Sequence, residues 1–492
     1  MDTEKIIEVL NLVSNEPNRI KTNSKLVVAG DIFIAVKGYA HDGHFFIKDA
    51  ILRGANKIVS ERNISSVEYL PREKFIFCEN SKIFLAELLK RAYNDPSGRM
   101  KIYGVTGTNG KTTSVFLLKS ILEKLGARIG LISTVYNNSS GETFVRSSMT
   151  TPDILDVYRL LGEMDLDNKK AAVIEVSSHA LSQERLKGIL FDAAILTNIT
   201  PEHLDYHKTM ENYLNDKIKI FDLLKLNGIG AVNIDDGLIK DAFAEIKKKH
   251  ACKILTFGID SDDCDFKAEN ISLSDTGVEF DIKSAGYKTI NIKSSFIGLH
   301  NVYNILGCVT VLLNKGINGD FIKDAVYHAL PVPGRLDAVS GNAPFKVFID
   351  YAHTPNALEN VLKSLRPITK NSLICVFGCG GDRDKLKRPL MGALAGKFSD
   401  MVILTSDNPR GEKPEDILRE IEKGLEGSKN YMVIQDRYEA INKAVNMGKR
   451  GDVIIIAGKG HEDYQIIGEI RTHFDDKEIA LKILKEKGYA VV

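Results

Sequence analysis

The 492-residue sequence lacks the features that mark membrane proteins and nucleic-acid-binding proteins. Its formal net charge of +1 leaves no basic excess for nucleic acid or for an anionic membrane surface. No apolar run approaches the roughly 20 residues of a membrane-spanning helix. The first residues, MDTEKIIEVLNLVSNEP, predict an acidic amphipathic helix rather than a signal peptide. We therefore expect a cytoplasmic protein without a nucleic-acid or membrane partner.

Cysteine is scarce, and its spacing does not indicate a metal site. Cys375 and Cys379 are closely spaced, but no second pair of cysteines accompanies them among the six in the sequence. A structural zinc site usually needs two such pairs or added histidines. We expect reduced thiols, which fits the reducing environment of the cytoplasm.

The chain is longer than a single hydrophobic core, and about three domains are expected. A helix stop and linker, NDPSG, ends the first part, and the segment ALPVPGR breaks the pattern a second time. We predict domains at residues 1–98, 99–330 and 331–492. Strand and helix patterns alternate in each, so the predicted fold class is α/β. The small first domain is followed by a central domain with a phosphate loop and a mostly parallel sheet, and then by a Rossmann-like domain.

The most informative stretch is KIYGVTGTNGKTTS at 101–114. A strand pattern leads into a glycine-rich turn with Lys111 and Thr112, and a helix is predicted to follow over residues 113–125. The N–H groups of such a turn bind phosphate, the lysine neutralises the outer phosphates, and the threonine hydroxyl holds Mg²⁺. The general pattern G-x-x-x-x-G-K-[ST] requires glycine where this chain has Val105, so the loop is of a particular variety. The alternative is an ordinary glycine-rich turn.

Two polar clusters follow predicted strands of the central domain. The strands at 171–176 and 193–198 end in segments that contain Glu175 and His203. Ligands of parallel sheets gather at the carboxyl ends of the strands. Together with Thr112, the two side chains could supply ligands to Mg²⁺. A single histidine after a strand is usually a surface residue, but two clusters together favour a functional site.

Four strands of the last domain, predicted at residues 345–350, 373–377, 401–405 and 453–457, also end in polar, turn-rich loops. These loops are residues 351–355, 378–383, 406–410 and 458–463. None carries the dinucleotide pattern G-x-G-x-x-G after a first strand, so NAD is not indicated. Arg335, Arg383 and Arg410 lie in loops, where arginine suits bidentate contacts with carboxylate or phosphate. The alternative for each is a salt-bridged surface residue.

A series of motifs resembles the Mur ligases from the first domain to the C-terminus. In order, they are TGTNGKTT, EVSSHAL, TNITPEHLDYH, GLHNVYN, PGRLD, DYAHTP, GDRDKLKRP, DNPR and GKGHEDYQ. The series is most similar to the branch of the family that adds the third residue of the peptidoglycan stem peptide. The family loop is TG[TS]NGK[TS], which accounts for Val105. The resemblance implies a UDP-binding first domain, a central ATPase and a C-terminal domain that closes over the site, and we expect a monomer.

The reaction that the resemblance implies is amide ligation with ATP and Mg²⁺. The D-glutamate side-chain carboxylate of UDP-N-acetylmuramoyl-L-alanyl-D-glutamate would attack the γ-phosphate of ATP. The amine of the incoming amino acid would then attack the acyl phosphate and release phosphate. Phosphoryl transfer of this kind needs positioning and charge neutralisation more than a protein nucleophile.

The resemblance also assigns individual residues to ligands. ATP would contact Gly107, Thr108, Asn109, Gly110, Lys111, Thr112, Thr113, Asn301, Arg335 and Asp350. The UDP-linked substrate would contact Ser24, Thr150, Thr151, Ser177, Gln183 and Arg185. Mg²⁺ would be held by Thr112, Glu175, His203 and Lys217, and catalysis would depend on Lys111, Glu175, His203 and Lys217. Three positions depart from the family: Asn23-Ser24-Lys25 replaces Asp-Ser-Arg, which changes two of them, and Glu202 replaces aspartate.

Lys217 lies in the helical pattern MENYLNDKIKIF and by itself indicates a solvated lysine. In the family the matching lysine becomes a carbamate, which turns a cation into an anionic metal ligand. This chemistry requires an amine that is neutral part of the time, as burial near other cations would favour.

The DNPR motif is the form that the family links with meso-diaminopimelate, whereas lysine-adding relatives usually lack its arginine. Diaminopimelate carries a second carboxylate at its far end. Arg410 could bind this carboxylate through two hydrogen bonds and would repel the ammonium of L-lysine. The predicted pocket for this amino acid consists of Arg383, Asp407, Asn408, Pro409, Arg410, Gly458 and Glu462, with Glu462 facing an ammonium.

Other functions stay open at this point. An L-lysine-adding enzyme, a folylpolyglutamate synthetase or the D-alanyl-D-alanine-adding Mur ligase would use the same ATP chemistry. The last is not expected to combine DNPR with GKGHEDYQ. A phosphate-loop regulator could bind a cell-wall precursor without ligating it, but a pure binder need not keep Thr112, Glu175, His203 and Lys217.

Overall fold

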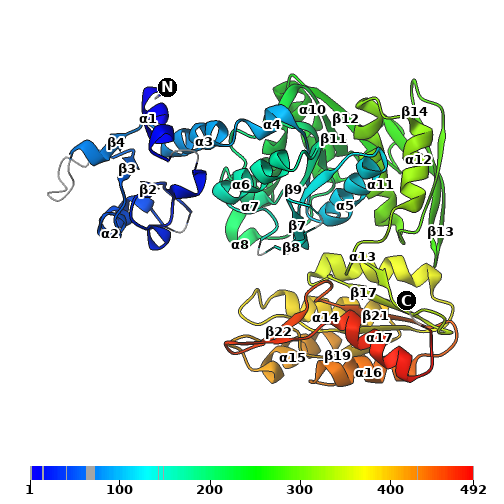
Figure 1. Cartoon of the computed structure of the whole chain (residues 1–492). Helices are drawn as coiled ribbons and strands as arrows, with labels where there is room; N and C mark the ends of the chain where they lie inside the picture. Colours follow the sequence, from blue (N-terminus) through cyan, green and yellow to red (C-terminus); the bar gives the residue numbers. More distant parts are fainter. Residues whose placement is uncertain are drawn as a thin grey trace. The chain divides into compact units, whose positions relative to one another are not determined.

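The computed structural model describes residues 3–490 except 14–15, 40, 63–71, 142, 148 and 429. Figure 1 shows the chain coloured along the sequence. It divides into two compact units, of which the first comprises residues 1–111 and 122–255 and the second residues 112–121 and 256–492. The predicted domain limits near residues 98 and 330 fall inside these units, so the division into three domains stays a prediction.

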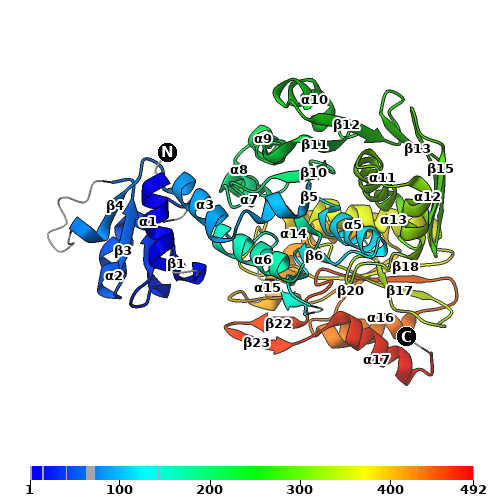
Figure 2. The ribbon, with the colours of Figure 1, turned by 45° about the horizontal axis from the view of Figure 1, so that its top comes forward.

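The first part of unit one is a parallel sheet in the order β1-β2-β3-β4. Its elements are α1 (Thr3–Val13), β1 (Ile20–Lys21), β2 (Ile32–Ile34), α2 (Ile47–Leu52), β3 (Lys57–Ser60), β4 (Phe75–Phe77) and α3 (Ser81–Ala92). Alternate side chains of β2 face opposite sides. Ile32 and Ile34 join the core that contains α1, whereas Phe33 packs with Ile47 and Ala50 of α2. Figure 2 shows α1 lying along this sheet.

A second sheet in unit one carries the phosphate loop and has the order β11-β10-β5-β9-β6-β7-β8. Its strands are β5 (Lys101–Thr106), β6 (Ile129–Ile132), β7 (Tyr136–Asn138), β8 (Val145–Arg146), β9 (Ala171–Glu175), β10 (Phe191–Leu196) and β11 (Leu224–Asn233). The strands from β11 to β6 pair in parallel, and β7 and β8 are antiparallel. β9 and β10 are buried along their whole lengths, which confirms the predicted parallel sheet covered on both faces.

One short helix precedes the first strand of this sheet, and further helices lie between and after the strands. They are α4 (Pro96–Arg99), α5 (Lys111–Lys124), α6 (Ile154–Leu166), α7 (Ser178–Ser182), α8 (Leu204–His207), α9 (Met210–Ile218) and α10 (Gly237–Lys249). The division between the two units falls within α5 and again within β12 (Lys253–Gly258).

Unit two begins with β12 paired in parallel to β13 (Phe266–Ser274), and β14 (Gly277–Ser284) and β15 (Ile290–Ser294) continue antiparallel. α11 (Leu299–Asn314) and α12 (Gly319–His328) follow. α11 is buried along most of its length, as expected for a helix that is apolar on nearly every side.

The last sheet has the order β16-β17-β21-β18-β19-β20 and is parallel except for β16. Its strands are β16 (Asp337–Ala338), β17 (Lys346–Asp350), β18 (Leu373–Phe377), β19 (Met401–Leu404), β20 (Tyr431–Val433) and β21 (Val453–Ala457). A hairpin of β22 (Tyr464–Ile467) and β23 (Ile470–His473) follows β21. This arrangement confirms the predicted Rossmann-like α/β sheet.

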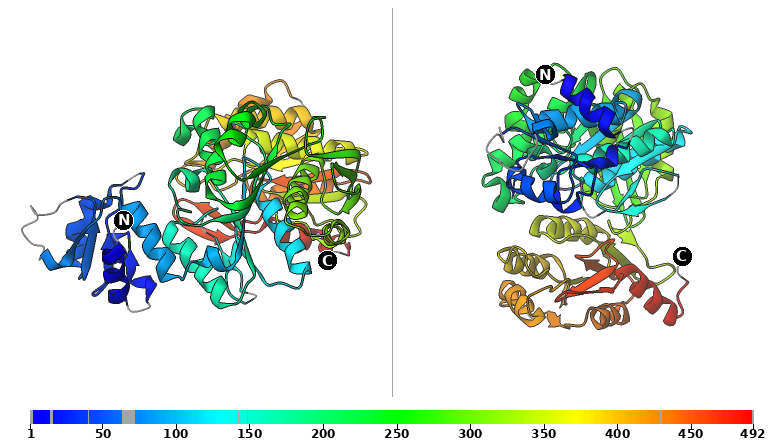
Figure 3. Two further views of the ribbon diagram at one scale, coloured as in Figure 1. Left: turned by 90° about the horizontal axis from the view of Figure 1, so that it is seen from above. Right: turned by 60° about the vertical axis from the view of Figure 1, so that its left-hand side comes forward.

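Helices cover both faces of the last sheet. They are α13 (Pro355–Leu365), α14 (Lys387–Phe398), α15 (Pro414–Glu422), α16 (Arg437–Met447) and α17 (Asp476–Glu486). The first three pack on the face with Cys375 and Phe377 of β18, and the last two pack on the face with Ile374 and Val376. Figure 3 shows these layers from another side. The carboxyl ends of the strands are left to the polar loops.

Within the described residues, no helix combines the length and the apolar character needed to cross a membrane.

Candidate functional site

The phosphate loop is held in shape by the end of the neighbouring strand β10. The N–H of Thr108 donates to the carbonyl of Asn198 at 2.8 Å. The N–H of Asn109 donates to the side-chain Oδ1 of Asn198 at 2.9 Å. Thr197 Oγ1 donates to the carbonyl of Asn109 at 2.6 Å. Gly107 has φ 148°, and a Cβ there would lie 1.9 Å from Thr197 Oγ1. Only glycine fits position 107, because the strand end passes so close to it.

The helix after the loop, α5, begins at Lys111 rather than at the predicted Thr113. Gly110 caps it in the left-handed conformation, with φ 85°. The first turn therefore presents unsatisfied N–H groups directly after the loop. The ammonium of Lys111 donates to the carbonyls of Gly107 and Thr108 at 2.9 and 2.7 Å. A positive charge and a helix N-terminus thus lie beside the same loop, as phosphate binding requires.

Lys217 is fully enclosed and is not the solvated lysine that its helical pattern alone indicates. Its Nζ donates to the carbonyl of Gly107 at 2.7 Å and lies 4.6 Å from the ring centre of Tyr213. Burial lowers the pKa of Lys217 well below its usual value, and the charge of Lys111 adds to this effect. The sequence therefore carries a lysine whose amine can be neutral.

The structure brings Glu175 and His203 to the same region. Glu175 is 1% exposed, and its Oε2 accepts a hydrogen bond from the N–H of Thr134 at 3.0 Å. Burial lowers the pKa of His203, and the charges of Lys111 and Lys217 act in the same direction. A neutral imidazole is the form that binds metal ions. The four predicted catalytic residues are thus close enough to influence one another electrostatically.

A hydrogen-bonded chain that sequence reasoning missed connects the segments carrying the predicted metal ligands. His207 Nε2 and Ser178 Oγ form a hydrogen bond of 3.0 Å, and Nδ1 of the same ring lies 2.8 Å from Asp216 Oδ2. Ser178 follows the Glu175 strand, His207 closes the loop of His203, and Asp216 directly precedes Lys217. His207 is the last residue of the motif TNITPEHLDYH, but the sequence does not indicate that its ring bonds Ser178 and Asp216.

The side chains predicted to hold a metal ion suit Mg²⁺, which substrate phosphates and water help to bind, better than an ion that is held by protein side chains alone. Among the described residues, no group of three or more His, Cys, Asp or Glu side chains is arranged to hold a metal ion. The predicted set contains one carboxylate and one imidazole, together with the Thr112 hydroxyl and Lys217. Mg²⁺ is commonly held by one or two carboxylates plus substrate phosphates and water. A carbamate on Lys217 would add a second anionic oxygen ligand.

Among the residues of unit two that are predicted to bind ATP, Arg335 has an N–H group without a hydrogen-bond acceptor among the described residues. Arg335 Nη2 donates to Thr112 Oγ1 at 3.1 Å, and its guanidinium carbon lies 4.6 Å from the ring centre of Tyr351. Arg335 Nε is buried and has no hydrogen-bond partner among the described residues. Asp350 accepts from two backbone N–H groups, and its burial raises its pKa. Asn301 lies buried in the first turns of α11. The unsatisfied Nε suits an anionic ligand.

A cavity of about 1460 Å³ in unit one lies among residues 22–53, 82–85 and 153–219. Of the residues predicted for the UDP-linked substrate, Ser24, Gln183 and Arg185 line it, whereas Thr150, Thr151 and Ser177 do not. The last three are connected to it indirectly, since Arg185 Nη1 donates to the carbonyl of Thr151 at 2.8 Å. Sequence reasoning missed the basic side chains of its lining, which are Lys25, Lys37, Arg53, Lys82, Lys208 and Lys219. Three of them, Arg53, Lys82 and Lys219, pair with Asp49, Glu184 and Asp216 of the same lining. Positive charge for a diphosphate would therefore come mainly from the other basic side chains.

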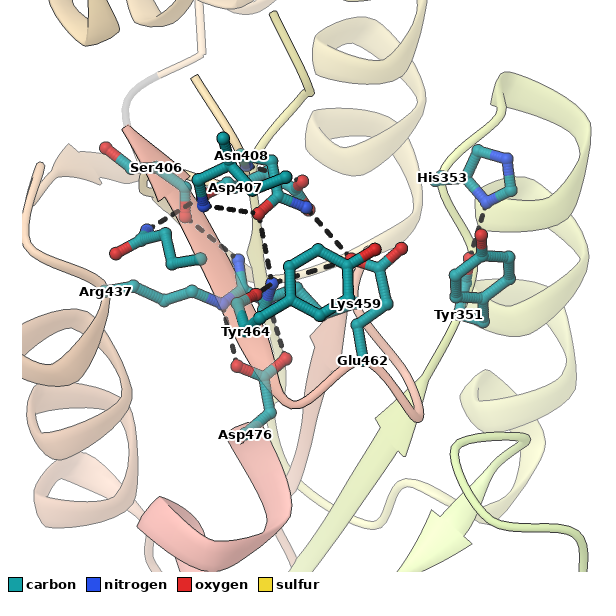
Figure 4. Close-up of polar contacts among 12 residues, drawn as sticks. Tyr351, His353, Ser406, Asp407, Asn408, Arg437, Lys459, Glu462, Tyr464 and Asp476 are labelled. Carbon is teal, nitrogen blue, oxygen red and sulfur yellow. Dashed lines mark hydrogen bonds and ion pairs between the residues drawn. The ribbon is translucent and has the colours of Figure 1, made fainter. Parts of the chain in front are cut away.

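Residues predicted for the amino-acid pocket lie on the loops that follow β19 and β21 (Figure 4). Asn408 Nδ2 donates to Glu462 Oε2 at 2.9 Å, and Lys459 Nζ lies 3.6 Å from the same oxygen. Burial and the charge of Asp407 raise the pKa of Glu462, and Lys459 opposes this shift. A Cβ on Gly458 would lie 2.8 Å from Asp407 Oδ2. The two loops therefore meet in direct contact.

Arg410 belongs to the same assembly through its backbone and its side chain. It adopts the left-handed conformation, with φ 53°, and its N–H and carbonyl bond Ile466 and Gly468 of the hairpin at 3.0 and 2.8 Å. Its Nη1 donates to the carbonyl of Gly381 at 3.0 Å. Arg383 is exposed on the adjoining loop. The structure thus brings the DNPR motif beside the GDRDK loop and the hairpin.

Three family models match this chain. Residues 17–93 match the domain described as Mur ligase family, catalytic domain, residues 105–312 the Mur ligase middle domain, and residues 334–460 the Mur ligase, glutamate ligase domain. A curated relative from Clostridium acetobutylicum, UDP-N-acetylmuramoyl-L-alanyl-D-glutamate--2,6-diaminopimelate ligase 1, is 42% identical over 473 residues, covering 96% of this chain and 95% of its own.

Two solved structures of Mur ligases are similar to this chain over most of its length. A structure of a UDP-N-acetylmuramoyl-L-alanyl-D-glutamate--2,6-diaminopimelate ligase is 31% identical with a TM-score of 0.69, and the match covers 96% of this chain and 95% of that one. A MurF ligase from Thermotoga maritima, solved in complex with ADP, is 21% identical with a TM-score of 0.62 over 95% of this chain and 97% of its own. At that identity the second match indicates a shared fold alone.

Proposed function

The chain belongs to the Mur ligase family, and from this premise we propose that it adds meso-diaminopimelate to the D-glutamate side-chain carboxylate of UDP-N-acetylmuramoyl-L-alanyl-D-glutamate. The energy comes from ATP, and the product serves peptidoglycan synthesis in the cytoplasm. The observation that carries the proposal is that Arg410 and Glu462 lie on adjoining loops, which the hydrogen bond from Asn408 to Glu462 joins. The names of relatives at 42% identity over nearly the whole chain support it.

The first step joins two anions, and the residues around the phosphate loop serve to neutralise their charge. The D-glutamate carboxylate attacks the γ-phosphorus, ADP leaves, and an acyl phosphate forms on the substrate. Lys111 and the N–H groups of the loop hold the triphosphate. Glu175, His203, Thr112 and the carbamate of Lys217 would hold Mg²⁺, which supplies further positive charge to the phosphates.

In the second step the amine of the incoming amino acid attacks the carbonyl carbon of the acyl phosphate. Phosphate leaves, and the nitrogen loses a proton as the amide bond forms. The loops at the ends of β19 and β21 orient this amine by holding the far end of the amino acid. Arg410 would pair with its carboxylate and Glu462 with its ammonium. L-lysine lacks the far carboxylate and would leave the guanidinium unpaired.

Ligation is expected to require both substrates. Phosphate release should depend on the UDP-linked dipeptide and on meso-diaminopimelate, and L-lysine should support far less turnover at equal concentration. An unpaired guanidinium costs roughly 2–5 kcal/mol, which corresponds to a loss of at least about 30-fold. Phosphate release and product mass, measured with diaminopimelate, lysine and ornithine, check this expectation. Equal turnover with lysine contradicts the specificity, and precursor binding without phosphate release contradicts ligation itself.

Lys217 is expected to carry a carbamate. Its neutral amine would attack CO₂, so that a nitrogen–carbon bond forms and a proton is released. Protein equilibrated with carbon-13 bicarbonate should show a carbamate signal by NMR, and Lys217→Arg should remove it because arginine does not provide a neutral amine. Lys219→Arg, two positions away on an exposed side chain, is the matched control and should keep the signal. A spectrum that is the same for wild type and Lys217→Arg would exclude the modification.

A further inference from the structure

An arginine outside every recognised motif lies directly behind the amino-acid pocket. Arg437 is the first residue of α16, and Asp476 is the first residue of α17. Arg437 Nε donates to Asp476 Oδ1 at 2.8 Å and Nη2 donates to Oδ2 at 2.7 Å. Both side chains are 0% exposed. The pair is bidentate and completely removed from solvent.

The same guanidinium also binds the backbone at two strand ends. Nη1 donates to the carbonyl of Ser406 at 3.2 Å, and Nη2 donates to the carbonyl of Ala457 at 3.0 Å. Ser406 directly precedes Asp407 of the DNPR motif, and Ala457 directly precedes Gly458 of the GKGHE motif. Figure 4 shows Arg437 between Asp476 on one side and Ser406 on the other. One side chain therefore connects the two loops that form the pocket.

The two loops also carry charges that repel each other. Asp407 and Glu462 are both acidic, and the charge of Asp407 adds to burial in raising the pKa of Glu462. Lys459 lies against Asn408 Oδ1 at 3.5 Å and donates to the carbonyl of Tyr464. The positive charges of Arg437 and Lys459 offset the two carboxylates, and burial strengthens these interactions. A cation at the strand ends therefore lowers the repulsion between the two loops.

Stability alone does not account for a charged pair in this place. Removing two charges from water is costly, and apolar residues of similar volume often serve a buried position equally well or better. Arg437, however, donates four hydrogen bonds, to two carbonyl groups and to both oxygens of a carboxylate, which is one more than the three donors of an ammonium allow. The guanidinium has five such donors, whereas an ammonium is a compact charge without a fixed plane.

We propose that Arg437, held in its orientation by Asp476, is a positioning residue that sets the separation of the DNPR and GKGHE loops and thereby the affinity for the incoming amino acid. It does not touch the substrate. The inference rests on the proposed function, because it assumes that these loops hold diaminopimelate.

Arg437→Lys is the first test. It keeps the charge but loses the fixed plane of donors, so the KM for diaminopimelate should rise roughly 10- to 100-fold, while the KM for ATP should stay within about twofold. The matched control is Arg366→Lys. Arg366 Nη1 pairs with Asp400 Oδ2 at 2.7 Å, and Asp400 Oδ2 accepts from the N–H of Leu373 at the amino end of β18. This control changes an arginine–aspartate pair at the amino end of a strand, whereas the two loops follow the carboxyl ends of strands in the same sheet. It should leave the KM for diaminopimelate and the KM for ATP unchanged.

A second variant separates positioning from folding. The double substitution Arg437→Met with Asp476→Leu removes both charges and the donors to the two strand ends. If the pair only supports the fold, a double variant with a wild-type melting temperature should have a wild-type KM, and this result would overturn the proposal. If Arg437 positions the loops, the KM for diaminopimelate stays raised although the melting temperature is preserved. Should the double variant not fold, an unchanged KM in Arg437→Lys overturns the proposal by itself, and a raised one supports it.

The same assays distinguish this inference from the proposed function. Wild-type protein that releases no phosphate in response to diaminopimelate contradicts the proposed function. Wild-type protein that does so, together with an Arg437→Lys enzyme of unchanged KM, contradicts only the role of Arg437.

Discussion

Replacing Lys111 with methionine is expected to lower the kcat of ligation by roughly 10³-fold, because one positive charge at the transferring phosphoryl group is lost. The ammonium of Lys111 lies within hydrogen-bond distance of the loop carbonyls of Gly107 and Thr108. A ligand triphosphate in this loop would therefore have the charge beside it. ADP release under saturating ATP, the UDP-linked dipeptide and diaminopimelate measures the effect.

Lys124→Met is the matched control for this variant. Lys124 is exposed in the last turn of the same helix, α5, where the substitution should change kcat less than twofold. The loss of donors to two carbonyls in Lys111→Met costs about 1–3 kcal/mol of stability, so thermal unfolding is measured alongside. A folded Lys111→Met enzyme with a kcat within tenfold of wild type would contradict the role of the loop.

Arg410→Ala is expected to raise the KM for diaminopimelate by about 10²-fold and to leave the KM for ATP nearly unchanged. The lost interaction is a bidentate hydrogen bond between charged groups, whose truncation costs roughly 2–5 kcal/mol. The residues proposed to hold ATP lie on other segments, so the affinity for ATP should not change. Steady-state kinetics with each substrate varied in turn measure the two constants.

Backbone strain at Arg410 needs its own control, because the residue adopts φ 53°. Asparagine tolerates this left-handed conformation better than alanine does, so Arg410→Asn removes the guanidinium with less strain. Both variants should show the same rise in KM. Arg419→Ala, on an exposed side chain of α15, should show none. If the KM rises in the alanine variant but not in the asparagine variant, strain rather than the lost guanidinium is the cause.

The local parts of the structure could be predicted from sequence patterns. Short apolar runs between polar turns marked the buried strands, and the expected strand at 373–377 coincides with β18. The start of α5 was misplaced by two residues, since Gly110 caps the helix directly and no separate capping residue intervenes. The residues of the DNPR motif and Glu462 could be placed at strand ends, and the structure brings them into contact.

The burial of individual polar side chains, and the distant residues that they contact, could not be predicted from sequence patterns. Lys217 has the pattern of a surface lysine, yet its amine lies against Gly107, 110 residues earlier in the chain. Arg437 and Asp476 lie 39 residues apart and belong to no motif. Hydrophobic periodicity reports which face of a helix is buried, but not which distant group will meet a given side chain.

The sequence by itself determined which chemical groups lie together locally, because a glycine-rich loop followed by Lys111 and Thr112, and a DNPR segment after a strand, are each formed by consecutive residues. The tertiary structure alone decided the state of those groups. The pKa of Lys217 is lowered by enclosure beside Lys111, and the separation of Asp407 and Glu462 depends on a guanidinium from another helix. The reason is physical: electrostatic interactions and desolvation depend on distance through space, and only folding sets that distance.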